Sequence, residues 1–479
     1  MIDWSLQATH IAGTIFNIVY IGVIIGTIIV VILDNRNPVK TIAWVLVLMF
    51  LPLVGLIFYF FFGRSTRREK LINQKSYDRL LKKPMAAYNA QKPEEVPETY
   101  KPLMQFFWET NQSLPFQATE VEIYTNGYSK IKALLRELLK AKHHIHLEYY
   151  IFLDDAIGRM IKDTLIQKAK EGVEIRVIYD DVGSWETPNA FYEDMRDAGI
   201  EVRSFLKVRF PLFTSRVNYR NHRKIVVIDG ETGFIGGMNL AERYVKGFPW
   251  GIWRDTHILL RGRAVHGLQT AFLLDWYFVD QTLITSSCYF PRIDTPGSIL
   301  TQTVTSDPVG PWKEIMQGLT IAITTAKKYV YIQTPYFLPS ETILAALQSA
   351  ALAGIDVRLM IPSRCDNRIT QWGSRSYLKD VLNAGVKVYF YKKGFLHSKI
   401  MVSDDMLSTV GSTNIDFRSF EHNFEVNAFI YDIETALNLK EVFLQDQRDS
   451  AQISMKKWQA RPLYQKAIES VVRLLAPLL

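Results

Sequence analysis

The chain has 479 residues, of which 48% are hydrophobic, and its formal net charge is +8. This length and apolar content exclude a mainly disordered chain and provide for two or three domains with a large core. The two cysteines, Cys288 and Cys365, lie far apart and outside any Cys-x-x-Cys spacing, which argues against a disulfide framework and a thiolate zinc site and fits a reducing compartment. The positive charge suits an anionic partner, either nucleic acid or an acidic membrane surface.

Two uncharged apolar segments open the chain, at residues 11–33 and 41–62. Each is long enough for a helix that crosses a hydrocarbon core of roughly 30 Å. A cleaved signal peptide is the alternative for the first segment, but residues 1–10 contain no Lys or Arg and no Ala-x-Ala site follows. We therefore predict a transmembrane hairpin over residues 1–62.

Basic residues are concentrated after the second apolar segment. Residues 64–83 contain eight Lys or Arg, whereas the loop between the segments contains only Arg36 and Lys40. The positive-inside bias then places both ends of the hairpin, and the bulk of the chain, in the cytoplasm. Pro84, Pro93, Pro97 and Pro102 are mixed with acidic residues within residues 63–116, and we predict a basic, proline-containing tether rather than a packed element there.

The remaining chain contains an internal repeat. Residues 141–181 and 326–366 each show a β-type alternating run, an amphipathic helical pattern that ends in a glycine, and a second apolar run. Each copy therefore predicts a βαβ unit. We expect an α/β fold of two homologous lobes, residues 117–290 and 291–479, with mixed, mainly parallel sheets flanked by helices.

After its βαβ unit, each lobe contains the same motif, His-x-Lys-x4-Asp-x6-Gly-x-x-Asn. The two copies consist of His222, Lys224, Asp229, Gly236 and Asn239, and of His397, Lys399, Asp404, Gly411 and Asn414. In a strand the histidine and the lysine share one face. Lysine and asparagine donors around a histidine can hold phosphate oxygens while the imidazole attacks phosphorus. An ordinary strand explains one such copy but not two with all five positions kept.

These paired motifs resemble the signature of the phospholipase D superfamily, and the resemblance covers residues 117–479. The two apolar N-terminal segments, the "HLEYYIF" strand, "WRDTH" at Trp253–His257 and "NIDFRSFEHNFE" at Asn414–Glu425 are most similar to bacterial cardiolipin synthases within it. The resemblance implies that the two motifs face each other across a pseudo-twofold axis and form one active site. It also implies a bacterial cell membrane as the location.

The activity that the resemblance implies is transesterification between two phosphatidylglycerol molecules. One histidine attacks the phosphodiester and glycerol leaves, after which the primary hydroxyl of a second phosphatidylglycerol displaces the phosphatidyl-histidine to give cardiolipin. The other histidine supplies and removes the protons. The expected partners are phosphatidylglycerol and anionic membrane lipid, with no nucleic acid.

The resemblance further assigns roles to single residues. Asp255 would orient His222 and Glu425 would orient His397, so that the correct imidazole tautomer faces phosphorus. Asp229 and Asp404 would hold the geometry of the motif rather than touch substrate, and Asn239 and Asn414 would bind phosphate. His222 is the expected nucleophile, because the N-terminal motif usually carries it in this superfamily and Arg220 and Arg223 flank it here.

Two features depart from this pattern or compete with it. The first motif reads Gly236-Gly237 where the second reads Gly411-Ser412, so one serine hydroxyl is missing from the first lobe. A histidine cluster at residues 143–146 suggests a metal, but no nearby Cys or carboxylate completes a tetrahedral set, and the motif lysines already provide positive charge. We therefore expect no metal and no cofactor.

Two further segments suggest contact with a membrane. Residues 205–220 interleave cations with aromatic side chains, as an interfacial segment does, although a solvated loop has the same composition. The C-terminal segment from residue 461 has helical apolar spacing, and it either lies on the membrane or closes the second lobe.

Other functions remain to be weighed against cardiolipin synthesis. A nucleic-acid phosphodiesterase would gain little from membrane spans, and no periodic aromatic stacking platform is evident. A noncatalytic scaffold would not keep two intact motifs. A phospholipase D-type hydrolase, or a phosphatidyltransferase with another alcohol acceptor, shares every catalytic residue and stays open.

Overall fold

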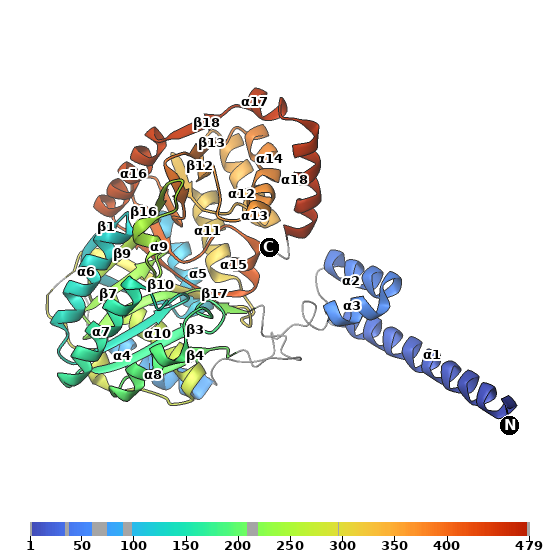
Figure 1. Ribbon diagram of the computed structural model, residues 1–479. Helices are drawn as coiled ribbons and strands as arrows, with labels where there is room; N and C mark the ends of the chain where they lie inside the picture. Colours follow the sequence, from blue (N-terminus) through green and yellow to red (C-terminus); the bar gives the residue numbers. More distant parts are fainter. Residues whose placement is uncertain are drawn as a thin grey trace. The chain divides into compact units, whose positions relative to one another are not determined.

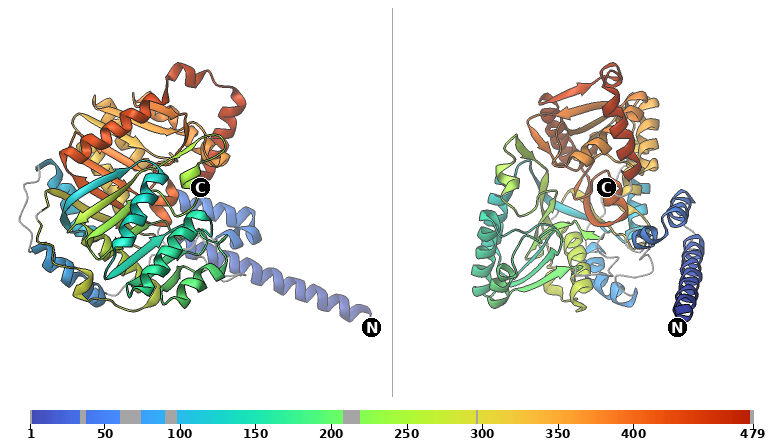
Figure 2. Two further views of the ribbon diagram at one scale, coloured as in Figure 1. Left: turned by 60° about the vertical axis from the view of Figure 1, so that its left-hand side comes forward. Right: turned by 45° about the vertical axis from the view of Figure 1, so that its right-hand side comes forward.

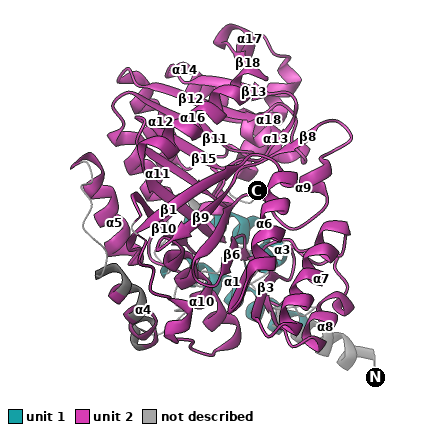
Figure 3. Cartoon of the chain, turned by 90° about the vertical axis from the view of Figure 1, so that its left-hand side faces the viewer, with its two compact units in different colours: residues 1–68, 208–218 teal, residues 69–207, 219–479 magenta. Residues whose placement is uncertain are grey.

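The computed structural model describes residues 2–33, 38–59, 74–89, 98–207, 219–295 and 297–476. The chain divides into two compact units (Figure 3). Unit 1 comprises Met1–Arg68 with Val208–Asn218, and unit 2 comprises Glu69–Lys207 with Tyr219–Leu479.

The described part of unit 1 is helical, with α1 (Ile2–Leu33), α2 (Pro38–Phe50) and α3 (Pro52–Phe58). Gly13–Leu33 is long and apolar enough to cross a membrane, and it is the one such helix in the described ranges. The prediction of a second continuous spanning helix is not confirmed, because the helix is interrupted at Leu51. Pro52 has no N–H to donate and is accommodated in the first turn of α3.

Unit 2 is built on one long mixed sheet (Figures 1 and 2). In the first lobe the strands lie in the order β4 (Glu201–Phe205), β3 (Glu174–Asp180), β2 (His144–Tyr149), β6 (Lys224–Ile228), β7 (Thr232–Gly236), β9 (His257–Gly262) and β1 (Pro115–Tyr124). The second lobe continues with β10 (Ile299–Ser306), β17 (Asn423–Tyr431), β16 (Leu407–Gly411), β15 (Ile400–Ser403), β11 (Tyr329–Gln333), β12 (Asp356–Pro362), β13 (Lys387–Tyr391) and β18 (Ser450–Ile453). The order of the first seven strands is mirrored in the second lobe.

The expected βαβ units are present in both lobes. The strands β2 and β3 are parallel and are connected by α7 (Ala156–Lys170), while β11 and β12 are parallel and are connected by α12 (Glu341–Leu352). Both helices are followed by a glycine with φ of 91°, Gly172 or Gly354, a conformation that glycine adopts without the steric cost of a Cβ. The repeat read from the sequence is therefore a structural repeat.

The prediction of mainly parallel sheets is wrong. In the described first lobe only β2–β3 and β3–β4 are parallel, whereas β2–β6, β6–β7, β7–β9 and β9–β1 are antiparallel. The apolar run in the βαβ unit correctly indicated that the two strands of that unit, β2 and β3, are parallel. The motif strand β6 returns to β7 through residues 229–231, a short connection of the kind that joins antiparallel neighbours, and the other antiparallel pairs join strands far apart in the chain.

Helices cover both faces of the sheet. In the first lobe α6 (Gly127–Lys140), α7 and α8 (Asn189–Asp197) pack on the face that Ile145 and Leu147 present, and α10 (Val265–Asp280) lies on the opposite face, against His144 and His146. The second lobe repeats this with α11 (Glu314–Thr325) and α12 on one face and α16 (Ile433–Arg448) on the other. Further helices are η2 (Glu98–Tyr100), α9 (Arg243–Lys246), η4 (Ser287–Tyr289), α13 (Arg368–Ser376), α14 (Leu378–Asn383), α15 (Phe417–Glu421), α17 (Met455–Gln459) and α18 (Leu463–Leu475).

The antiparallel pair β1–β10 joins the two lobes at the centre of the sheet. The apolar cluster beneath it takes residues from both halves, including Leu268 of α10 and Phe443 of α16. The two lobes therefore share a core and form one compact unit.

The prediction of an unpacked tether over residues 63–116 is wrong where the structure describes that segment. Residues Gln74–Asn89 form α4, and Leu80 is buried against Phe272 and Trp276 of α10. Residues Lys101–Asn111 form α5, whose Phe107 is fully buried with its ring centroid 4.5 Å from that of Phe429. Prolines suggested an irregular segment, but Pro102 occupies the first turn of α5, where a missing N–H costs nothing.

Candidate active site

Each motif histidine follows a short strand that crosses into the other lobe. The strand β5 (Arg220–Asn221) of the first lobe pairs in parallel with β17 of the second lobe, and the backbone N–H of His222 donates to the carbonyl of Phe424 at 2.9 Å. The strand β14 (Gly394–Leu396) of the second lobe pairs in parallel with β8 (Ile252–Arg254) of the first, and the N–H of His397 donates to the carbonyl of Arg254 at 2.6 Å. Both histidines lie in the link between this short strand and the next.

These registers decide which carboxylate meets which imidazole. Nδ1 of His222 lies 3.0 and 3.1 Å from the two carboxylate oxygens of Glu425, and Nδ1 of His397 lies 2.6 Å from Oδ2 of Asp255. Both predicted carboxylates contact a motif histidine, but the expected pairing of Asp255 with His222 and of Glu425 with His397 is wrong. Each carboxylate directly follows the residue that accepts the backbone bond from the opposite lobe's histidine.

The charge states fix the imidazole tautomers. Burial by itself raises the pKa of Asp255, but the nearby Lys399 and His397 lower it more, so the pKa lies below its usual value. Burial also raises the pKa of Glu425, and His222 and Lys224 likewise lower it below its usual value. Both groups are therefore carboxylates at neutral pH and can only accept. Each Nδ1 then carries the proton, and each Nε2 keeps a free lone pair.

The imidazoles themselves are neutral near pH 7. Burial lowers the pKa of His222 to about 4, with Glu425 opposing that shift and Lys224 adding to it. Burial and Lys399, whose Nζ lies 2.7 Å from Nδ1, lower the pKa of His397 to about 3. The charge of His222 also lowers the pKa of His397, which places the two motifs in one electrostatic site.

The motif lysines are buried beside their histidines. The ammonium groups of Lys224 and Lys399 donate to the backbone carbonyls of His222 and His397, respectively. Burial lowers the pKa of Lys224 to about 7 and that of Lys399 to about 8, and the charge of Lys399 also lowers the pKa of Lys224. An anionic phosphodiester bound between them would favour the protonated form of both.

The motif aspartates stand at the far ends of their strands, as expected. The carboxylate of Asp229 accepts the backbone N–H groups of residues 142–144, and that of Asp404 accepts those of residues 327–329, all at 2.7–3.0 Å. Both aspartates have φ of 54°. They connect each motif strand to the first strand of its βαβ unit, and no described hydrogen bond joins either of them to His222 or His397.

The motif asparagines occupy unlike surroundings. Asn239 accepts the N–H of Ile151 at 3.1 Å and donates to the hydroxyl of Tyr244. The backbone N–H of Asn414 donates to Ser419 at 3.2 Å, while its side-chain Oδ1 is buried without a hydrogen-bond partner. Neither arrangement tests the expected phosphate contact.

The missing serine of the first lobe has a steric reason. A Cβ on Gly237 would lie 2.1 Å from Oδ1 of Asp255, so the carboxylate occupies the space that a side chain needs. In the second lobe Ser412 donates its hydroxyl to Glu425 instead. The lobes therefore hold a short carboxylate beside glycine and a longer one beside serine.

The arginines near His222 do not make its surroundings more cationic than those of His397. Arg223 is buried, donates to Asp275 and, from Nε, to the carbonyl of Glu425 at 3.0 Å. Arg220 lies 3.5 Å from the carboxylate of Asp180. These carboxylates balance both guanidinium charges, so the electrostatic reason for preferring His222 as the nucleophile is wrong.

Aromatic side chains surround the imidazoles, and sequence reasoning did not select them. The Tyr150 ring contacts His222 with centroids 5.1 Å apart, while Trp253 and Phe395 contact His397 at 5.0 and 5.4 Å. The Tyr336 centroid lies 6.4 Å from that of His397, and its hydroxyl donates to Asp366. Tyr150 and Tyr336 come shortly after the first strand of their βαβ units, and this shared position in the repeat could have identified them from the sequence.

The histidine cluster is part of the core. His144 and His146 both contact Gln269 of α10, and the His146 ring stacks on Phe272 with centroids 4.4 Å apart. The structure describes no group of three or more His, Cys, Asp or Glu arranged to hold a metal ion within the described ranges. Of the interleaved segment 205–220, Phe205 is fully buried in β4, and residues 208–218 lie outside the described residues.

Two imidazoles with their Nδ1 protons held by buried carboxylates, among buried lysines in a duplicated α/β fold, form a candidate phosphoryl-transfer site. The family model for the cardiolipin synthase PLD-like domain matches residues 134–247 and 319–447, and the model for the phospholipase D-nuclease N-terminal segment matches residues 22–64. The chain belongs to the cardiolipin synthase family of the phospholipase D superfamily.

Relatives of the chain match it over nearly its whole length. It is 43% identical over 460 residues to a cardiolipin synthase of Geobacillus sp. (strain WCH70), covering 94% of this chain and 91% of that protein. It is 41% identical over 480 residues to the major cardiolipin synthase ClsA of Bacillus subtilis (strain 168), covering 98% and 100%. The crystal structure of phosphatidylserine synthase from Haemophilus influenzae Rd KW20 has the same fold, with a TM-score of 0.61, 14% identity, and coverage of 79% of this chain and 98% of that one.

The crosswise pairing predicts which histidine responds to each carboxylate. In Glu425→Gln, His222 loses the opposite charge that favours its imidazolium form, so its pKa falls further and the acid limb of the pH–rate profile moves to lower pH. Turnover at neutral pH falls by about 10²–10⁴-fold because the tautomer is no longer fixed. Asp255→Asn lowers the pKa of His397 in the same way, and because His397 gives the proton in the first step, the alkaline limb of the profile moves to lower pH.

Nuclear magnetic resonance titration of nitrogen-labelled imidazoles assigns the change. The His222 signals should shift in Glu425→Gln and the His397 signals in Asp255→Asn, with His257, which contacts neither carboxylate in the described hydrogen bonds, as the internal control. A response of His397 to Glu425→Gln, with His222 unchanged, would contradict the pairing.

The packing around Gly237 predicts that introducing the serine that the first motif lacks reduces activity. Gly237→Ser should displace the Asp255 carboxylate and reduce turnover by at least tenfold, because the hydrogen bond to His397 is disturbed. Ser412→Gly, the matched exchange, removes one donor to Glu425 and should reduce turnover less. Steady-state assays with circular dichroism of both variants measure this, and an active Gly237→Ser enzyme would contradict the steric account.

Proposed function

We propose that the chain is a cardiolipin synthase that transfers a phosphatidyl group from one phosphatidylglycerol to another through a phosphatidyl-histidine intermediate. Glycerol is the other product. The observation that supports this most directly is the pair of imidazoles, each with Nδ1 held by an ionised carboxylate of the opposite lobe. The names of the relatives support the choice of lipid substrates.

The first step uses the Nε2 lone pair of His222. Nε2 attacks phosphorus, the P–N bond forms, and the P–O bond to glycerol breaks as His397, whose imidazolium form Asp255 and the bound anionic phosphodiester favour, gives its Nε2 proton to the leaving oxygen. Glu425 stabilises the positive charge that develops on the attacking imidazole. Asp255 would do the same when His397 carries its proton.

In the second step the proton is transferred in the opposite direction, from the attacking alcohol to His397. The primary hydroxyl of a second phosphatidylglycerol attacks phosphorus, its proton passes to Nε2 of His397, and the P–N bond breaks to release His222 and cardiolipin. Lys224 and Lys399, with Asn239 and Asn414, hold the phosphate oxygens. In this scheme no cofactor is required, because the lysines supply the positive charge.

The site favours transfer over hydrolysis through its surroundings. Both histidine side chains are nearly buried, with 12% of His222 and 8% of His397 exposed. The aromatic side chains around them reduce the access of water to the intermediate. An alcohol delivered on a lipid then competes well with water.

We also propose the membrane arrangement in finer detail. Both apolar segments, 11–33 and 41–62, cross the bacterial cell membrane, with the interruption at Pro52 inside the second, and the lobes 117–290 and 291–479 face the cytoplasm. The basic residues after the second segment support this orientation. Interrupted helices are tolerated in membranes where neighbouring helices satisfy the freed backbone groups.

Product analysis tests the activity. Purified full-length protein in phosphatidylglycerol vesicles should produce cardiolipin and glycerol in equal amounts, and turnover should persist in EDTA. Mass spectrometry of the lipid extract and an enzymatic glycerol assay measure both products. His222→Ala and His397→Ala serve as inactive controls.

Phosphatidic acid as the main product would identify a hydrolase, and transfer to an added alcohol in preference to phosphatidylglycerol would identify a different transferase. Loss of turnover in EDTA would contradict the metal-free scheme.

Adduct mapping tests the assignment of the nucleophile. With an activated phosphodiester whose leaving group needs no proton, His397→Ala should accumulate a phosphatidyl adduct on His222, because the base that activates the second alcohol is missing. His222→Ala should form none. Acid quench and peptide mass spectrometry locate the adduct, and an adduct on His397 of His222→Ala, with none on His222 in the converse variant, would reverse the two roles.

A further inference from the structure

The C-terminal helix α18 has one face that no part of the described chain covers. Five apolar side chains are exposed on it, by 80% for Leu463, 64% for Tyr464, 61% for Val471, 80% for Leu474 and 45% for Leu475. At 100° per residue these positions occupy about a third of the helix circumference. The exposed apolar residues are therefore a continuous stripe and not scattered single side chains.

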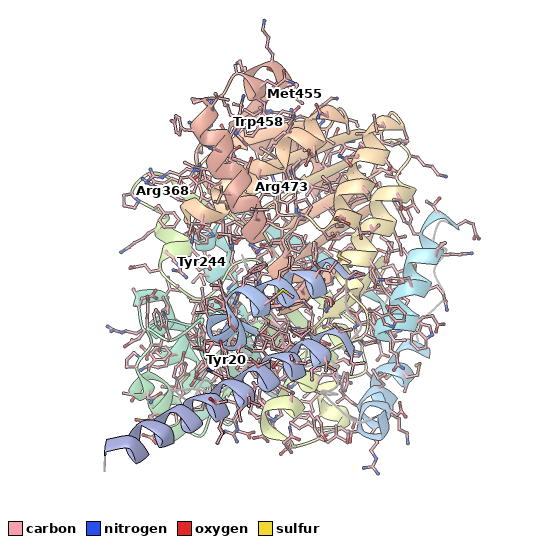
Figure 4. All side chains as sticks on the ribbon, turned by 90° about the vertical axis from the view of Figure 1, so that its right-hand side faces the viewer. Tyr20, Tyr244, Arg368, Met455, Trp458 and Arg473 are labelled. Carbon is pink, nitrogen blue, oxygen red and sulfur yellow. The ribbon has the colours of Figure 1, made fainter. Side chains whose placement is uncertain are left out.

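The remaining faces of α18 bind it firmly to the second lobe. Val472 and Ala476 are buried, and Glu469 is buried in an ion pair with Arg461, whose guanidinium stacks on Trp458. Arg473 pairs with Asp380 at 2.8 Å and lies over the Tyr377 ring. The helix is thus fixed to the lobe through Arg473 (Figure 4), and its apolar stripe stays exposed. The two roles that the sequence left open are compatible, since α18 closes the lobe with one face only.

The charges around the stripe indicate its partner. Residues 455–475 contain five Lys or Arg and one acidic residue, Glu469, which is internally paired. Lys456 and Lys457 are exposed in α17, next to Trp458 (Figure 4). An outward apolar stripe flanked by cations is the composition of a helix that lies in the interface of an anionic bilayer.

The same helix is connected to the rim of the active site. It packs against α13, whose Arg368 and Ile369 are exposed at its start (Figure 4). Two residues before Arg368, Asp366 accepts the hydroxyl of Tyr336, the tyrosine beside His397. Contact of α18 with a bilayer would therefore bring this rim to the depth of lipid headgroups.

We propose that α18, with the exposed lysines of α17 and the start of α13, is a docking surface for an anionic lipid bilayer. It holds the second lobe on the membrane surface with the apolar stripe among the upper acyl chains. The chain contains a helix fit to cross a membrane, so a bilayer is always within reach, whereas a soluble protein partner would have to be recruited. The proposal concerns membrane contact and stands whichever alcohol the enzyme accepts.

Fluorescence quenching in full-length protein tests the contact. In a Cys288→Ser and Cys365→Ser background, a bimane label is placed at Leu474→Cys or at Leu352→Cys, an exposed leucine of α12 in the same lobe that is 74% exposed. Both proteins are reconstituted in vesicles of equal parts phosphatidylglycerol and phosphatidylcholine, with or without brominated acyl chains.

Brominated lipid should quench the label at position 474 several-fold more than the label at 352, and aqueous iodide should show the reverse order. Replacing phosphatidylglycerol with phosphatidylcholine should weaken the lipid quenching at 474. Equal responses of the two labels to both quenchers would overturn the proposal. Protection of position 474 from iodide without quenching by brominated lipid would also overturn it, since a protein partner would then cover the stripe.

A charge substitution tests the consequence for turnover. Leu463→Glu with Leu474→Glu should reduce turnover on phosphatidylglycerol vesicles by about threefold to tenfold, because two apolar contacts with the bilayer are lost. Leu352→Glu with Ile433→Glu, the matched control, should leave it unchanged. In detergent mixed micelles both variants should equal the unmodified protein, and equal turnover of both variants on vesicles would contradict the role of α18.

Discussion

The site depends on two short parallel strand pairings that cross between the lobes. Because β5 pairs with β17 and β14 with β8, each histidine meets a carboxylate of the opposite lobe. Asp255 and Glu425 are fully buried, and removing one partner of such a pair costs roughly 3–5 kcal/mol. Neither lobe can therefore hold a complete acid–base pair alone. The β5–β17 and β14–β8 pairings, which bring each carboxylate to its histidine, therefore also hold the two lobes together.

The duplication is symmetric in topology and asymmetric in chemistry. The motif aspartates make the same three backbone bonds in both lobes, so the scaffold has kept its symmetry. Around the carboxylates the lobes differ, with Gly237 beside Asp255 and Ser412 beside Glu425. A reaction with a nucleophile and a proton carrier needs two unlike histidines, and such differences give each its own surroundings.

A lipid substrate requires a site that is closed to water and open to a bilayer. The buried lysines keep charge ready for a phosphodiester, while Tyr150, Trp253 and Phe395 line the imidazoles with apolar surface. The helix α18 connects the site to the membrane-facing surface, because it packs on α13, which begins close to the site. Chemistry and membrane contact are then linked through rigid secondary structure rather than through the N-terminal segment.

The sequence by itself determined the duplicated α/β architecture, the two motifs whose histidines and lysines are the candidate catalytic residues, and the aspartates that hold each motif, because these follow from local spacing that recurs. It did not determine the crosswise carboxylate pairing, since β5 and β14 are too short to give a strand signal and their partners lie about 200 and 140 residues away in the chain. The antiparallel majority of the sheet and the packing of α4 and α5 were likewise decided by long-range contacts. Tertiary structure decides these features because strand partners and buried surfaces depend on residues distant in sequence, which local sequence patterns do not indicate.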